Sequence, residues 1–67
     1  MKIDLNSSDK LFLKNNHFII DYEKNYTDEE FLNLLDDLYF QEISYVEVDD
    51  EKARRFADIA DIVAKLG

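Results

Sequence analysis

The stretch from Tyr26 to Gln41, YTDEEFLNLLDDLYFQ, constrains the fold more than any other part of the chain. Thr27 and Glu30 have the spacing of a capping box, in which the Thr hydroxyl accepts the Glu30 amide and the Glu carboxylate accepts the Thr27 amide. Beyond this cap, large apolar residues recur at i, i+3, i+4 and i+7, at Phe31, Leu34, Leu35 and Leu38. The stretch therefore predicts an amphipathic helix, with Leu32 and Tyr39 widening one edge of its apolar stripe.

The C-terminal part of the chain predicts a strand followed by a second helix. Ile43 to Val48 is predicted to be a strand, in which Val46 and Val48 alternate with Tyr45 and Glu47, so that Glu47 points away from the two valines. Asp49 is the expected N-cap of a helix over residues 50–66, with Gly67 available as a C-terminal stop. The apolar stripe of that helix consists of Ala53, Phe56, Ala57, Ile59, Ala60, Val63 and Leu66.

The N-terminal part favours strands. Lys2 to Leu5 alternates polar and apolar residues, and two apolar triplets, at 11–13 and 18–20, flank Asn15-Asn16, where Asn tolerates the positive φ of a tight hairpin turn. In this hairpin Phe12 faces Ile19 on the side opposite the core. A rival interpretation makes residues 8–15 a short helix capped by Asn6 or Ser7. We rank it second because no i, i+3, i+4 stripe runs through residues 14–16.

Together these elements predict one α+β domain over residues 1–67. The predicted order is β-β-β-α-β-α, with a small, mainly antiparallel sheet and both helices packed on one of its faces. A chain of this length has a small core, and it lacks the cysteines that could staple it.

Charge is distributed unevenly along the sequence. The net charge is −8, from 16 acidic and 8 basic residues. Residues 21–51 contain twelve carboxylates and a single cation, Lys24, so this segment carries −11, while the two flanks together carry +3. The centre of the chain is therefore an acidic block between mildly basic ends.

Composition argues against several classes of function. There is no cysteine and only one histidine, His17, which is expected to be solvated at the end of the hairpin, so we expect no enzyme. Asp36-Asp37 and residues 49–51 lack the spacing of a calcium loop, so we expect no metal and no cofactor. Direct nucleic-acid binding needs a basic footprint, which is missing. No segment approaches the ~20 apolar residues of a membrane span, so the chain is expected to be cytoplasmic.

The acidic block supports a hypothesis of protein binding. We expect a non-enzymatic inhibitor or regulator that docks a carboxylate-rich surface on a basic site of a partner protein. One version is a nucleic-acid mimic of the phage or plasmid type, whose carboxylates imitate phosphates and occupy a nucleic-acid-handling protein. The expected partner-binding residues are Glu29, Asp36, Asp37, Phe40 and Glu47. The alternative is a structural homodimer or assembly module, joined through Phe12 and Ile19, whose acidity serves only solubility.

Overall fold

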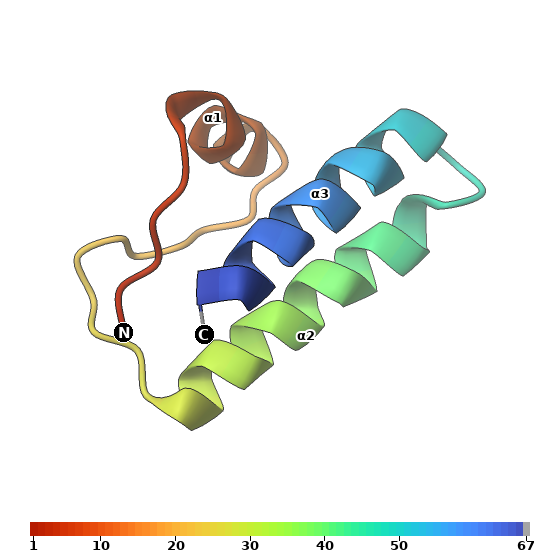
Figure 1. Cartoon of the computed structure of the whole chain (residues 1–67). Coiled ribbons are helices and arrows are strands. Elements are labelled where there is room, and N and C mark those ends of the chain that lie inside the picture. Colours follow the sequence, from red (N-terminus) through yellow and green to blue (C-terminus); the bar gives the residue numbers. More distant parts are fainter. Residues whose placement is uncertain (67) are drawn as a thin grey trace.

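The computed structural model describes residues 1–66, and these residues form three helices and no strand. The helices are α1 (Ser7–Asn15), α2 (Asp28–Tyr45) and α3 (Asp50–Leu66). α2 and α3 lie side by side and antiparallel, joined by a short turn, while α1 and the extended segments around it lie to one side of the pair (Figure 1). The predicted α+β fold, with its antiparallel sheet, is therefore wrong. The predicted stop at Gly67 lies outside the described residues.

The caps of the two long helices are confirmed. The Glu30 amide donates to Thr27 Oγ1 at 3.2 Å, and the Thr27 amide donates to Glu30 Oε1 at 3.1 Å, which completes the capping box of α2. At the start of α3 the Lys52 amide donates to Asp49 Oδ1 at 3.2 Å. The expected ends of α3 are also correct. Both helix starts could therefore be predicted from capping side chains, which accept hydrogen bonds from the free amides of the first turn.

The predicted hairpin is wrong, and the rival interpretation of residues 8–15 as a helix is correct. Asn6 caps α1 by accepting the Asp9 amide at 2.8 Å. The helix ends in a Schellman motif, in which the Phe18 amide donates to the Leu13 carbonyl at 2.9 Å and His17 takes a φ of 60°. The polar tetrapeptide 14–17 does contain a residue at positive φ. That residue ends a helix instead of turning a hairpin.

Both other predicted strands are also wrong. Helix α2 continues through Ile43 to Tyr45, and residues 46–48 form the turn before α3, so Glu47 lies on this turn with exposed valines on either side. Residues 2–5 are extended, and the alternation there does reflect burial, since Ile3 and Leu5 are buried and their neighbours are exposed. These residues pair with no strand. The nearest equivalent is a reciprocal backbone pair between Met1 and Tyr26, with two N···O distances of 2.6 Å.

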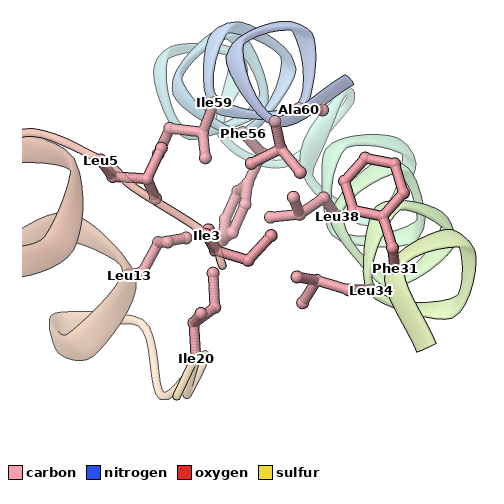
Figure 2. Packing of buried hydrophobic residues seen from close by; sticks show 11 residues of the cluster. Ile3, Leu5, Leu13, Ile20, Phe31, Leu34, Leu38, Phe56, Ile59 and Ala60 are labelled. Atoms are coloured by element: carbon pink, nitrogen blue, oxygen red, sulfur yellow. The ribbon is translucent and has the colours of Figure 1, made fainter. Parts of the chain in front are cut away.

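Phe56 of α3 lies at the centre of the core. Its side chain is fully buried, and aromatic rings from three other parts of the chain surround it. Phe12 and Phe18 meet it edge-on at centroid distances of 5.0 and 6.3 Å, and Tyr45 stacks on it at 5.8 Å. Other apolar side chains from the N-terminal segment, α1, the segment after α1 and α2 complete this core (Figure 2), among them Ile3, Leu5, Leu13, Ile20, Phe31, Leu34 and Leu38.

One ion pair attaches α1 to α3. Asp9 is only 5% exposed, and its Oδ1 lies 3.3 Å from Nη2 of Arg55. The Arg55 guanidinium also lies over the Phe12 ring, at 5.0 Å from the centroid. Glu51 and Arg55, like Arg54 and Asp58, have the i, i+4 spacing of ion pairs on α3, but neither pair forms among the described residues. Arg54 instead pairs with Asp50 at 3.2 Å.

Candidate functional site

The five residues expected to bind a partner are all exposed, four on α2 and one just beyond it. Glu29, Asp36 and Phe40 are seven and four residues apart, so they share one side of the helix. Asp37 lies about 100° further around the helix, and Glu47 lies on the turn after α2. We call these five residues the acidic surface. Phe40 is its apolar member and is 67% exposed.

All the charged residues of helix α2 are acidic. Over residues 28–45 it carries six carboxylates and neither lysine nor arginine. Helix α3, of nearly the same length, carries four acidic and four basic residues and has no net charge. The polarity seen along the sequence is thus, in the folded chain, a contrast between two neighbouring helices.

The first-turn carboxylates of α2 have a structural role. Asp28, Glu29 and Glu30 complement the helix dipole, and Glu30 closes the capping box. A hydrogen bond from Lys24, together with the bond from the Thr27 amide, lowers the pKa of Glu30 to about 2. The same hydrogen bond raises the pKa of the Lys24 ammonium. Glu30 therefore belongs to the helix cap and not to the acidic surface.

Asp36 and Asp37 have no comparable role. They lie in the middle of α2, beyond the turn where an acidic side chain benefits from the helix dipole. Within residues 1–66 neither carboxylate forms an ion pair or accepts a hydrogen bond. Two adjacent, exposed and unpaired carboxylates add like charge to an acidic helix without stabilising it. Their presence in α2 is therefore not explained by a contribution to the stability of the fold.

Sequence reasoning misplaced several apolar residues of α2. The periodicity predicts that Leu32 and Tyr39 lie at the edge of the core stripe, yet Leu32 is 57% exposed and Tyr39 is also exposed. Ile43 and Val46 were assigned to a strand, and both are exposed, Ile43 on α2 and Val46 at its C-cap. Each of these side chains follows a core position or a half-buried one by a single residue. A step of one residue is a rotation of about 100° around a helix. This one-residue step from the core positions is the signal in the sequence that could have identified these side chains as lying outside the core.

The expected interface between Phe12 and Ile19 loses its structural basis. Phe12 is half-buried, with its ring against Phe56 and beneath Arg55. Ile19 is 82% exposed and lies in the extended segment after α1. The two side chains do not form a cross-strand pair, because there is no hairpin. Self-association through Ile19 stays a prediction.

The surface also has an open groove beside α1. An open groove of about 440 Å³ separates α1 from the segment that follows it. Its lining is mostly apolar and includes two lysines, with no histidine and no carboxylate: Ser7, Lys10, Leu11, Lys14, Phe18, Ile19, Ile20 and Tyr22. Over the part of the chain that the structure describes, no three acidic or histidine side chains gather as metal ligands. None of the helices within residues 1–66 has the length and apolar character needed to cross a membrane.

Comparisons with protein-family models, with curated proteins and with solved structures found no match to this chain. The functional inference therefore rests on the geometry of the chain itself.

Proposed function

We propose that this protein is a non-enzymatic binding protein, an inhibitor or regulator that docks its acidic surface on a basic site of a partner protein. The observation that carries the proposal is the unpaired carboxylate pair at Asp36 and Asp37, on a helix with no basic residue. A group of exposed carboxylates without cations among them attracts a basic partner over a distance of about 8 Å at physiological salt. Phe40 lies one turn beyond these residues and adds an apolar contact at the same surface.

A nucleic-acid-handling protein is one partner that suits this surface, because such proteins present basic residues to phosphates. The proposal excludes nucleic acid as the direct partner, since carboxylates repel phosphates. It includes a cytoplasmic location, which a chain without cysteine fits.

The test compares two variants that change the net charge equally. Asp36→Asn with Asp37→Asn neutralises the acidic surface, and Asp58→Asn with Asp61→Asn neutralises two exposed carboxylates of α3. Immobilised proteins are exposed to lysate at low salt, and retained proteins are released by raising the salt and identified by mass spectrometry. The association rate of a retained partner is then measured with each variant.

We expect a basic protein that the wild type and the α3 variant retain, and for which the Asp36/Asp37 variant lowers the association rate about tenfold or more. Equal retention and equal rates for all three proteins would contradict the proposal. The acidity would then serve solubility alone, as the alternative of a structural assembly module requires.

A further inference from the structure

Helix α2 carries a second apolar stripe beside the one that faces the core. The core-facing stripe contains Phe31, Leu34, Leu38 and Tyr45, and each of these residues is followed directly by another apolar residue. One residue along a helix is a rotation of about 100°, so the followers lie on a different side of α2. With Ile43 they form a row at spacings of three and four residues, which we call the outer stripe: Leu32, Leu35, Tyr39, Ile43 and Val46.

Most of the outer stripe is open to solvent. Leu32 is 57% and Ile43 is 69% exposed, and Tyr39 and Val46 are also exposed, while Leu35 is half-buried and packs against the edge of the core. Single exposed apolar residues are ordinary on a protein surface, but four exposed ones in a row along one helix indicate a contact site. The row covers about 21 Å of α2, given the rise of about 1.5 Å per residue.

The charges around the outer stripe determine what can cover it. Glu29 and Asp36 follow one edge of the stripe, and Glu42 lies between the stripe and the core side of the helix. A second copy of α2, laid on the stripe in either direction, would bring carboxylates against carboxylates with no cation on either helix. Anionic membranes and nucleic acids would be repelled for the same reason. The complementary surface is therefore apolar in the middle and basic at its edges.

The spacing of the outer stripe specifies the shape of that surface. Intervals of three and four residues over four helical turns are the pattern by which two helices interlock their side chains. We infer that α2 binds a basic amphipathic helix of its partner, which packs its apolar side on the outer stripe and places lysines or arginines beside Glu29 and Asp36. This inference rests on the proposed function and adds the chemistry of the partner.

The test uses two fluorescent peptides about as long as α2. One carries leucines at helical intervals of three and four among lysines and arginines, and the other has the same composition in an order without that periodicity. Binding is followed by fluorescence anisotropy at low salt, and helix formation by circular dichroism. We expect the periodic peptide to bind about tenfold or more tightly than the scrambled peptide and to become helical on binding.

Matched variants locate the contact. Leu32→Gln with Ile43→Gln alters the outer stripe, and Leu11→Gln with Ile19→Gln replaces the same residue types where Leu11 is 58% and Ile19 is 82% exposed. We expect the first pair to remove the preference for the periodic peptide and the second pair to keep it. Urea melts confirm that all variants remain folded.

Three other outcomes would overturn the inference. Equal binding of both peptides would show that charge alone acts, and the proposed function would stand without the helix. Binding of neither peptide at low salt would remove the inference of a helical partner, and the retention experiment would then decide the proposed function. A wild type that is dimeric in sedimentation equilibrium, with a monomeric Leu32→Gln/Ile43→Gln variant, would assign the outer stripe to a second copy of the chain.

Discussion

At the residue scale, Glu30 links the stability of the fold to pH. Because Lys24 and Thr27 stabilise the ionised carboxylate, the pKa of Glu30 falls from its ordinary 4.5 to about 2 in the folded chain. A lowered pKa in the folded state means that the contribution to stability is complete above the unfolded pKa and is lost as the pH falls through the folded one. The cap should therefore weaken between pH 4.5 and about 2.

The variant Glu30→Gln tests this linkage. We expect it to be less stable than the wild type near neutral pH, and the difference in the free energy of unfolding to shrink below pH 4.5 and to be mostly lost near pH 2. Urea unfolding of both proteins across this range measures the difference. Glu29→Gln is the control, because Glu29 is exposed next to the cap without forming its hydrogen bonds. A difference for Glu30→Gln that stays constant with pH would contradict the prediction.

His17 is the one described residue at positive φ, and glycine is the residue that usually occupies this place after a helix. A left-handed conformation costs a residue with a β-carbon about 1–2 kcal/mol, which glycine avoids. Glycine recovers only part of this because it loses more entropy on folding. We therefore expect His17→Gly to stabilise the protein by about 0.5–1 kcal/mol.

Thermal or urea unfolding of His17→Gly measures that gain. Lys14→Gly places the same residue inside the last turn of α1, where it should destabilise by about 0.5–1 kcal/mol. If both glycines destabilised equally, the left-handed conformation at residue 17 would not be the source of the cost.

At the element scale, the pairing of Arg55 with Asp9 attaches α1 to α3. Removing Arg55 would leave a buried carboxylate without its partner and would uncover the Phe12 ring. We expect Arg55→Ala to destabilise by about 1–3 kcal/mol, since a buried acceptor that loses its donor bears the cost of desolvation. Arg54→Ala is the matched control, because its pair with Asp50 is exposed and such pairs contribute about 0.5 kcal/mol or less. Equal midpoints for the two variants in urea would contradict this account of how α1 docks.

The elements that sequence reasoning predicted correctly are those with local signals. Thr27, Glu30 and Asp49 identify the starts of α2 and α3, because a cap depends only on neighbouring residues. The apolar periodicity also identified the buried members of both long helices. Local chemistry therefore sufficed for two of the elements.

The elements that were predicted wrongly have apolar patterns that suit either a strand or a helix, and only their packing partners in the folded chain decide between the two. The triplets around Leu13 and Phe18 suit a strand, but Leu13 is buried in α1 and Phe18 packs against Phe56 beyond its end. Ile43 belongs to α2, because the helix continues to Tyr45 and so includes the first half of the segment that resembles a strand. Tertiary packing overrides weak β-propensity in both places. For the candidate site, exposure of the carboxylates could be predicted, but the outer stripe required the observed burial of α2.

At the scale of the whole molecule, the carboxylates and the residues that pack in the core lie on different sides of α2. α2 uses one side for the core, a second for the outer stripe and the remainder for carboxylates, whereas α3 balances its charges. The −8 net charge is thus a property of one helix and its flanking turns more than of the surface in general. A basic partner attracted by this negative charge would approach the molecule from the side of α2.

The extended segments on either side of α1 are held to α2 and α3 by apolar side chains, and the backbone pair between Met1 and Tyr26 joins these two segments only to each other. Ile3, Leu5 and Ile20 are buried, yet their backbone amides donate to no protein group within residues 1–66. Apolar burial, together with the ion pair between Asp9 and Arg55, fastens residues 1–27 to the helix pair without a ladder of backbone bonds. This part of the chain can therefore detach as a unit while α2 and α3 keep their internal hydrogen bonds.

Amide hydrogen exchange should reveal this division as two kinetic classes. We expect the amides of Ile3, Leu5 and Ile20 to exchange rapidly despite their buried side chains, and those of Leu38 and Ile59, inside the long helices, to exchange only on much rarer opening. Heteronuclear NMR after transfer to deuterated water measures both classes. Protection at Ile3 and Ile20 equal to that at Leu38 would mean that the chain opens only as a whole.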